Sequence, residues 1–294
     1  MPPRGRNWIV KSHALGNDYL VLDPAALTFA LTPAVIRRLC HRHLGVGSDG
    51  ILAVAPATRA DFGLRIFNPD GSEAEKSGNG LRIFAKFLYD HRYTRRPQFT
   101  IETPGGVAGV TLHLRDGRVA QMTVDVGRAT FWSDEIPVAG PRREVVGEPI
   151  EAGGQRLTFT GVSVGNPHCV VFVPDLRQVA LRDLGPLLET HPLFPHRTNV
   201  QFARVAARDR IEIVIWERGA GETMASGSSA SAVAAAAVRA GTADRDVTVA
   251  MPGGELRIQV AEDWRIRMTG PASEVYAGTL SDDLVEALAA LDGP

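Results

Sequence analysis

Two short stretches of this sequence place a serine and a glycine where an apolar helix is predicted to begin. They are residues 73–80 (EAEKSGNG) and 222–229 (ETMASGSS), so Ser77 and Ser226 lie 149 positions apart (226 − 77 = 149). A helix N-terminus exposes free backbone N–H groups and the positive end of the helix dipole. We therefore expect two related halves, each presenting a helix start to one shared anionic ligand.

The hydroxyl groups of these serines could carry a proton or act as nucleophiles only with a base beside them, because an alkanol ionises far less readily than a thiol. The candidate bases are Glu75, Lys76, Glu217, Glu222 and His168. Lys76 directly precedes Ser77, so we expect its side chain to diverge from that serine and to lie in solvent. The sequence alone pairs neither serine with a particular base.

Small polar motifs recur where β-rich runs end, and loops of this kind often carry binding residues. They are residues 15–18 (LGND), 67–71 (FNPDG), 165–168 (GNPH), 197–200 (RTNV) and 216–219 (WERG). Any one of them is explained by turn geometry alone, because Asn and Gly are favoured in turns for backbone reasons. Residues 45–50 (GVGSDG) match G-x-G-x-x-G, but they follow a helix and lead into a strand, which predicts a turn and not a dinucleotide site.

Short β-rich runs bounded by Gly, Pro and Asp dominate both halves. Four helices are predicted, over residues 33–43, 78–90, 227–240 and 282–291. The two that begin at the Ser-Gly pairs are apolar on most sides, which is typical of buried helices, and they are too short to span a membrane. The pattern predicts that each half is a curved sheet wrapped around its own central helix, with the boundary near residues 120–127.

Composition limits the function classes that the chain can serve. Its 294 residues are 44% hydrophobic and 22% charged, as in soluble globular proteins, and the length fits two domains. A net charge of −1 gives no basic excess for binding nucleic acid. No signal peptide and no run of 18 apolar residues is found, so we expect a cytoplasmic protein with no membrane partner.

The two cysteines, Cys40 and Cys169, cannot form a disulfide framework and do not have metal-site spacing. Cys40 shares a helix face with Val35, Ile36 and Leu39, so it is interpreted as a core residue. The eight histidines show no zinc pattern, and no metal is expected.

Taken in order, the motifs resemble those of the diaminopimelate epimerases, which invert one α-carbon of diaminopimelate without pyridoxal phosphate. The matching stretches are residues 11–18 (KSHALGND), 45–50 (GVGSDG), 68–75 (NPDGSEAE), 77–82 (SGNGLR), 165–169 (GNPHC) and 217–222 (ERGAGE). The resemblance covers nearly the whole chain, and chance agreement across six ordered motifs is negligible.

The resemblance implies an α+β fold of two pseudo-symmetric halves, each a barrel-like, mostly antiparallel sheet around a central helix. The first half would be residues 1–123 completed by 272–294, the second half residues 124–271, and the site would lie in the cleft between them. It also implies a zwitterionic amino acid as the ligand, no cofactor, and a homodimer, since the family commonly forms dimers.

The resemblance further implies roles for individual residues. Ser77 and Ser226 occupy the positions of two family cysteines, one of which removes the α-proton while the other delivers a proton to the opposite face. The residues implied to hold the amino and carboxylate groups are Asn17, Asn68, Asn166, Asn199 and Arg218, with Arg218 gripping the distal carboxylate. The N–H groups around Gly78, Asn79, Gly227 and Ser228 would receive the α-carboxylate, while His168 and Glu217 would contact the substrate, Glu217 at its α-amino group.

Three functions stay open at this point. The first is a diaminopimelate epimerase that is impaired by serine at both proton-transfer positions, whether those serines are native or were introduced to trap a substrate complex. The second is a different racemase or a dehydratase on the same fold. The third is a catalytically silent amino-acid-binding protein, in which the serines simply cap helices.

Overall fold

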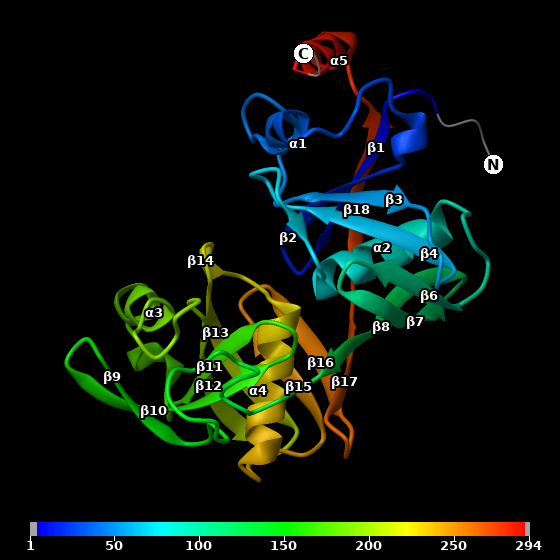
Figure 1. Cartoon of the computed structure of the whole chain (residues 1–294). Helices are drawn as coiled ribbons and strands as arrows, with labels where there is room; N and C mark the ends of the chain where they lie inside the picture. The colour runs from blue at the N-terminus through cyan, green and yellow to red at the C-terminus, as the bar shows by residue number, and fades with distance from the viewer. Residues whose placement is uncertain (1–4, 292–294) are drawn as a thin grey trace. The chain divides into compact units, whose positions relative to one another are not determined.

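The computed structural model describes residues 5–291 and contains two compact units. Unit 1 extends to Val124 and takes up the chain again at Pro271, whereas unit 2 extends from Asp125 to Gly270. The chain therefore leaves unit 1 once and returns to it, so that its first and last strands belong to the same unit (Figure 1).

Unit 1 is a mostly antiparallel sheet with four short helical segments. Its strands are β1 (Trp8–Ala14), β2 (Asn17–Leu22), β3 (Ile51–Ala55), β4 (Phe62–Phe67), β5 (Glu73–Ala74), β6 (Gln98–Thr103), β7 (Gly106–Arg115), β18 (Ser273–Thr279) and the first part of β8 (Arg118–Arg128). Its helices are η1 (Pro24–Ala26), α1 (Pro33–Cys40), α2 (Gly78–Asp90) and α5 (Asp282–Ala289). The strand order is β18-β1-β2-β3-β4-β6-β7-β8, with β2–β3 and β4–β6 parallel and β5 paired to β4.

Unit 2 is built in the same way. Its strands are β9 (Glu148–Ala152), β10 (Gln155–Ser163), β11 (Pro167–Phe172), β12 (Asn199–Ala207), β13 (Arg210–Glu217), β14 (Gly221–Thr223), β15 (Asp246–Met251), β16 (Gly254–Val260) and β17 (Arg265–Gly270). Its helices are η2 (Leu176–Gln178), α3 (Leu181–Glu189) and α4 (Gly227–Arg239). The strand order is β9-β10-β11-β12-β13-β15-β16-β17, with β11–β12 and β13–β15 parallel and β14 paired to β13.

The two units thus repeat one strand order in space, including the short hairpin strand that precedes each central helix. They differ in the chain position of the outer strand, because β9 comes first in unit 2 whereas β18 comes last in unit 1. The repeat extends to the pairing register. Leu20 pairs with Ile51 and Cys169 pairs with Val200, a shift of 149 positions for both partners (169 − 20 and 200 − 51). Ser77 and Ser226 are related by the same shift, so the predicted pseudo-symmetry is confirmed and the two serines occupy equivalent places in it.

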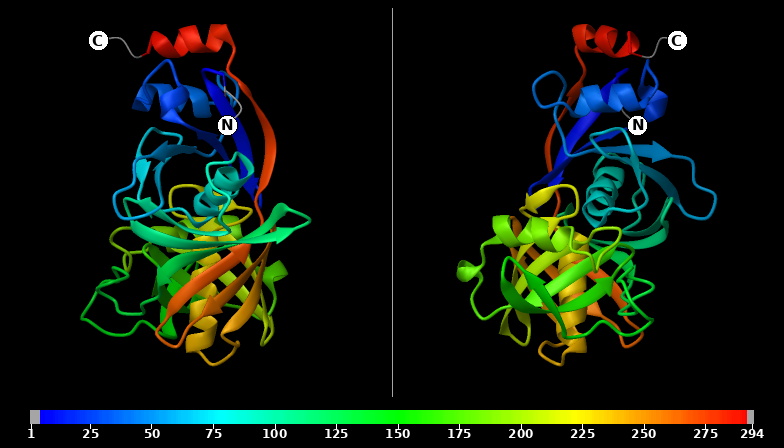
Figure 2. Two further views of the ribbon diagram at one scale, coloured as in Figure 1. Left: turned by 90° about the vertical axis from the view of Figure 1, so that its right-hand side faces the viewer. Right: turned by 60° about the vertical axis from the view of Figure 1, so that its left-hand side comes forward.

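Each unit encloses one helix, as the apolar pattern predicted. In α4 every residue from Ser229 to Ala237 is buried, and the helix contacts seven strands of its own unit, β10 to β13 and β15 to β17 (Figure 2). Alanine and serine side chains let the helix lie close to the sheet. Helix α2 is buried along most of its length and contacts β1, β2 and β7, but its buried residues include the polar Asn79 and Arg82.

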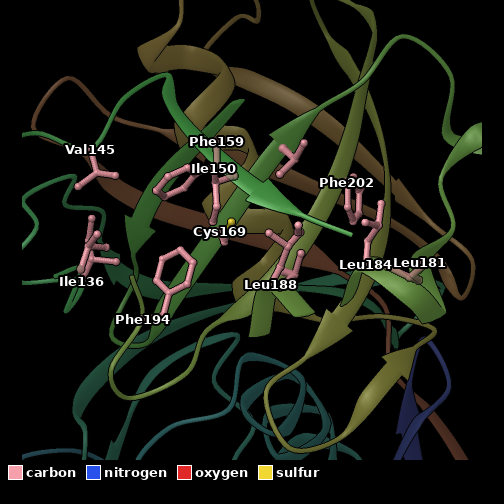
Figure 3. Close-up of a cluster of buried hydrophobic side chains, with 14 residues drawn as sticks. Ile136, Val145, Ile150, Phe159, Cys169, Leu181, Leu184, Leu188, Phe194 and Phe202 are labelled. Carbon is pink, nitrogen blue, oxygen red and sulfur yellow. The ribbon is translucent and has the colours of Figure 1, made fainter. Parts of the chain in front are cut away.

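Both cysteines are core residues, which was predicted for Cys40 alone. Cys169 lies among Phe159, Phe194 and Phe202 in the hydrophobic cluster of unit 2 (Figure 3). Cys40 belongs to the cluster of unit 1 that joins the buried face of α1 to α5. Burial raises the pKa of both thiols, so neither is poised to act as a thiolate.

Helix α3 and the strands β9 and β18 were not predicted from the sequence. Pro186 lies inside α3 and follows Gly185, a pair of residues that ordinarily argues against a helix. Helix α1 ends at Cys40 and not at residue 43, because His41 leaves the helical conformation with ψ at 120°. The predicted turn at residues 45–50 is confirmed, since it joins α1 to β3.

Candidate active site

Both central helices begin at a capping serine with nearly the same backbone conformation. Ser77 precedes α2 with φ −141° and ψ 119°, and Ser226 precedes α4 with φ −143° and ψ 121°. The Ser77 hydroxyl oxygen accepts the backbone N–H of Gly80 at 3.0 Å, and that of Ser226 accepts the N–H of Ser229 at 3.5 Å. The other N–H groups of each first turn remain for a ligand, beside the positive end of the helix dipole.

Ser226 lies against a carboxylate. Its hydroxyl donates to Glu217 Oε2 over 3.0 Å. The hydroxyl oxygen of Ser228 lies 3.4 Å from the hydroxyl oxygen of Ser226. Glu217 is the last residue of β13, and the β13–β14 hairpin returns the chain to the start of α4. With 4% of its surface exposed, Ser226 is shielded from water, so the neighbouring carboxylate can draw its proton.

Ser77 has a different neighbour. The hydroxyl of Tyr19, which projects from β2, lies 3.4 Å from the Ser77 hydroxyl. A neutral phenol is a far weaker base than a carboxylate, so this contact cannot activate Ser77 as Glu217 activates Ser226. The two equivalent serines therefore stand in chemically unequal surroundings.

A hydrogen-bond network in unit 2 brings together several residues predicted to bind substrate. Asn199 donates from Nδ2 to the carbonyl of Pro167 at 2.8 Å and accepts the backbone N–H of Arg218 at 3.0 Å. His168 Nε2 lies 2.9 Å from Asn166 Oδ1. These contacts join the start of β11, the start of β12 and the end of β13 at one edge of the sheet.

His168 is completely buried, and burial lowers the pKa of its imidazole to about 3, although the Gln201 side chain works in the opposite direction. The ring is therefore neutral at neutral pH and has a single N–H group. The contact with the Asn166 carbonyl oxygen places that hydrogen on Nε2. In this arrangement His168 fixes the direction of the Asn166 amide.

The loop that carries Glu217 and Arg218 is held by Glu189, a buried residue at the end of α3. Glu189 accepts the backbone N–H of Gly219 at 3.0 Å and the indole N–H of Trp216 at 2.8 Å. The Arg218 guanidinium donates to the carbonyl of His196 at 3.2 Å. Because Arg218 is exposed and a guanidinium has five N–H donors, donors remain for a carboxylate ligand.

In unit 1 the side chains of Asn17 and Asn79 are hydrogen-bonded to each other, whereas Asn68 bonds to Ser72 within its own turn. Asn79 Nδ2 donates to Asn17 Oδ1 at 3.0 Å. Asn68 donates from its backbone N–H to the carbonyl of Ser72 at 2.8 Å and from Nδ2 to the Ser72 hydroxyl at 2.9 Å. These bonds fix Asn68 locally.

The Asn17 side chain is hydrogen-bonded to a cluster of charged residues, Lys11, Asp18, Arg42 and Asp49. Asp49 accepts Asn17 Nδ2 at 3.0 Å and Arg42 at 2.6 Å, while Asp18 binds both Arg42 and Lys11. Burial alone would raise the pKa of Asp18, but the hydrogen bonds from Arg42 and Lys11 outweigh it and hold this pKa at about 2. The cluster therefore pairs two carboxylates with two cations, and the Asp49 carboxylate that accepts from Asn17 is held in place by Arg42.

Of the five candidate bases, Glu217 is hydrogen-bonded to one of the serines. Glu222 instead forms an exposed ion pair with Arg182 at 2.7 Å, and Glu75 is exposed. Across residues 5–291 we find no group of three His, Cys, Asp or Glu side chains arranged to hold a metal ion, and no helix that could cross a membrane.

A family model decides the relationship of the chain to known proteins. The model of diaminopimelate epimerase matches residues 9–132 and 160–275, which include both capping serines. The chain belongs to the diaminopimelate epimerase family. It is 50% identical over 276 residues to diaminopimelate epimerase 2 of Nostoc sp., covering 93% of this chain and 95% of that protein. It is 45% identical over 270 residues to the diaminopimelate epimerase of Pelotomaculum thermopropionicum, covering 91% and 96% of the two chains.

Solved structures show the same fold at much lower identity. A hydroxyproline epimerase from Agrobacterium vitis matches with a TM-score of 0.68 and 16% identity, over 93% of this chain and 90% of that one. A Bacillus anthracis phenazine biosynthesis protein of the PhzF family matches with a TM-score of 0.64 and 15% identity, over 93% and 98%. Relatives that are 40–50% identical carry the diaminopimelate epimerase name, so a different reaction on this fold is not favoured.

Some residues that contact the candidate site residues within either unit of this diaminopimelate epimerase relative were not identified from the sequence. They are Tyr19, Asp49, Arg82, Glu189 and Gln201. Tyr19 could have been found, because it lies 149 positions before His168 and so occupies the equivalent place in the repeat. Glu189 could not, because the helix that positions it carries the Gly185-Pro186 pair.

Proposed function

We propose that this protein is a cofactor-independent isomerase that interconverts LL- and meso-diaminopimelate by proton transfer at the α-carbon. The observation that carries the proposal is the doubled helix start, with a hydroxyl group at equivalent positions of two units that share one strand order in space. Inversion at a carbon atom needs one group to remove a proton and a second group to deliver one to the opposite face. Two equivalent helix starts supply such a pair.

In the proposed reaction Ser226 removes the α-proton as its own hydroxyl proton moves to Glu217. The electron pair left on the α-carbon delocalises into the carboxylate, where N–H groups around Gly78, Asn79, Gly227 and Ser228 stabilise the charge. The Ser77 hydroxyl then delivers a proton to the opposite face. The substrate gains one proton and loses one, and the two serines and Glu217 exchange protons with water before the next turnover.

Serine makes this chemistry slow. A thiol has a reference pKa of about 8.5, and each pKa unit by which an alkanol lies above a thiol adds about 1.4 kcal/mol to the cost of removing its proton. The Glu217 contact offsets part of this loss at Ser226, whereas the Tyr19 contact at Ser77 does not. We therefore propose that the chain binds its substrate well and turns it over slowly.

Binding of the rest of the amino acid is assigned to the polar residues at the ends of the strands. Asn17, Asn68, Asn166 and Asn199 would hold amino and carboxylate groups, with His168 and Glu217 completing the contacts. Arg218 would grip the distal carboxylate with the two parallel N–H groups that a guanidinium offers. The exposed position of Arg218 and the fixed amides of Asn166 and Asn199 support this assignment.

The test is deuterium incorporation from heavy water at the α-carbon of LL- and meso-diaminopimelate, for the present chain and for Ser77→Cys/Ser226→Cys. We expect slow incorporation by the present chain and much faster incorporation by the double variant. A chain that neither binds diaminopimelate nor exchanges its α-proton in either form would overturn the proposal. Loss of water from a hydroxylated amino acid without exchange would indicate the dehydratase instead.

We further propose that the protein is a homodimer. Val275 and Tyr276 of β18 are 58% and 45% exposed, and large apolar side chains side by side on a strand favour contact with another chain. Light scattering coupled to size exclusion should give a mass of two chains, and Tyr276→Glu should shift it toward one.

A further inference from the structure

The second turn of α2 contains a buried guanidinium that bonds to the side chain of Asn79, a residue assigned to substrate binding. Arg82 has no exposed surface, and its Nη2 donates to Asn79 Oδ1 at 2.8 Å. Its Nη1 donates to the carbonyl of Gly78 at 3.3 Å, and its Nε donates to that of Pro271 at 3.4 Å. Burial lowers the pKa of Arg82 to about 9, so the group is still protonated at neutral pH.

The bond to Asn79 is the first link of a relay of hydrogen bonds. Asn79 Nδ2 donates to Asn17 Oδ1 at 3.0 Å, and Asn17 Nδ2 donates to Asp49 Oδ2 at 3.0 Å. We call Arg82, Asn79, Asn17 and Asp49 the amide relay. Its two middle members are residues that the proposed function assigns to substrate binding.

The ends of the amide relay fix the direction of the groups between them. A protonated guanidinium can only donate hydrogen bonds, and an ionised carboxylate can only accept them. The carbonyl of Asn79 must therefore face Arg82 and the amino group of Asn17 must face Asp49, which leaves one arrangement for the bond between the two amides. Each amino group retains a second hydrogen, in a direction set by the relay.

We propose that Arg82 is a positioning residue for substrate binding, which holds the Asn79 and Asn17 amides in the one orientation that meets the ligand. This inference rests on the proposed function, because it assigns Arg82 to the same site. Arg82 itself is buried and is not proposed to contact the ligand, so any effect of Arg82 on substrate affinity must act through the Asn79 side chain.

The second unit offers an internal control. Ser231 of α4 stands 149 positions after Arg82 (231 − 82), and its hydroxyl donates to the carbonyl of Gly227 at 2.8 Å. Arg82 binds the equivalent carbonyl of Gly78. Both residues therefore support the first turn of a central helix, but Arg82 in addition binds the side chain of Asn79. Ser231→Ala therefore removes a side-chain bond to the first turn of a central helix without changing the amide relay, and serves as the control.

The experiment is a double-mutant cycle read by calorimetric binding of LL-diaminopimelate to the full chain. We expect Arg82→Met and Asn79→Ala each to weaken binding, by about 10-fold, and the double variant to be no weaker than Asn79→Ala alone. Arg82→Lys, which retains a donor and a positive charge, should recover part of the affinity. Ser231→Ala should leave the dissociation constant within about 2-fold of the parent.

A purely structural role for Arg82 gives a different result. In that case Arg82→Met lowers the melting temperature while the dissociation constant for diaminopimelate stays unchanged. Alternatively, Arg82→Met weakens binding independently of Asn79, so that the fold-losses of affinity of Arg82→Met and Asn79→Ala multiply in the double variant. Either outcome overturns the inference. If Arg82→Met does not fold, Asn79→Asp replaces it, because the carboxylate still accepts from Arg82 but cannot donate to Asn17, and the same loss of affinity is expected.

A second measurement separates this inference from the proposed function. If the parent chain does not bind diaminopimelate, the proposed function fails, and crystal structures of the parent and Arg82→Met still test the positioning role. We expect the Asn79 amide to rotate away from Asn17 in Arg82→Met and to stay in place in Ser231→Ala. An Asn79 amide that keeps its bond to Asn17 without Arg82 would overturn the inference.

Discussion

The Ser226 hydroxyl donates to the Glu217 carboxylate over 3.0 Å, whereas the neighbour of the equivalent Ser77 hydroxyl is the phenol of Tyr19 at 3.4 Å. The two helix starts share one backbone conformation, so this difference lies in the side chains. A carboxylate can take a proton from a hydroxyl and a neutral phenol cannot. The pseudo-symmetry of the fold therefore does not extend to the basicity of its two serines.

Single cysteine variants should reveal this inequality. Ser77→Cys keeps the Ser226–Glu217 pair, whereas Ser226→Cys leaves Ser77 beside Tyr19. We expect deuterium incorporation into diaminopimelate to be faster for Ser77→Cys, by about 100-fold, the lower end of what a general base contributes. Adding Glu217→Gln to Ser77→Cys should remove most of this advantage. Equal rates for the two single variants would show that Glu217 does not act on Ser226.

Removing the cap of α2 should destabilise the fold. Ser77→Ala loses the bond from the Gly80 N–H to the Ser77 hydroxyl, and we expect a loss of about 1 kcal/mol in the free energy of unfolding. Urea denaturation of Ser77→Ala measures the loss, and Ser77→Thr, which can still cap, serves as the control. A loss of equal size in both variants would count against capping as the cause.

His168 should make the fold sensitive to acid. Its pKa is about 3 in the folded chain and about 6.5 in an unfolded one, so the unfolded state takes up the proton first as the pH falls. Its contribution is therefore complete above pH 6.5 and declines by about 1.4 kcal/mol per pH unit below that value. Between pH 7 and pH 5 the chain should lose about 2 kcal/mol more in unfolding free energy than His168→Gln. Parallel pH profiles for the two proteins would contradict this prediction.

Gly185 should not tolerate a larger side chain. A Cβ atom at this position of α3 would lie 2.6 Å from ring carbons of Trp216, the residue before Glu217. Overpacking by this contact should lower stability by about 2 kcal/mol, of which the better helix propensity of alanine returns about 1 kcal/mol. Gly278→Ala is the matched control, since a Cβ there meets nothing within 4 Å. Urea denaturation of both variants should show a loss for Gly185→Ala alone.

The central helices and the repeat were predictable because their signals are local. The apolar residues of α2 and α4 follow capping serines directly, and the shift of 149 positions relates motif to motif. Helix α3 was missed because Gly185 and Pro186 have low helix propensity. The helix forms because it packs against Trp216, a contact between residues far apart in the sequence. The edge strand β18 was missed because all but one of its residues are exposed, so it lacks the alternation that marks a half-buried strand.

The partners of the site residues were less accessible to prediction. Asp49 lies 32 positions from Asn17 and Glu189 lies 30 from Gly219, so these bonds depend on how strands are brought together. Arg82 was quoted within a motif, but no sequence rule states that a helical arginine will be buried and will bind an asparagine three residues earlier. That contact depends on the enclosure of α2 by its sheet.

The return of the chain to unit 1 at Pro271 sets an order on synthesis. Strand β18 pairs with β1 along most of its length and α5 packs on the core beside α1, so unit 1 cannot be completed until β18 and α5 have left the ribosome. Unit 2 is continuous from Asp125 to Gly270 and has all of its strands earlier. The half that is made second is thus the first able to finish folding, while β1 waits with an open edge for a strand more than 250 positions downstream.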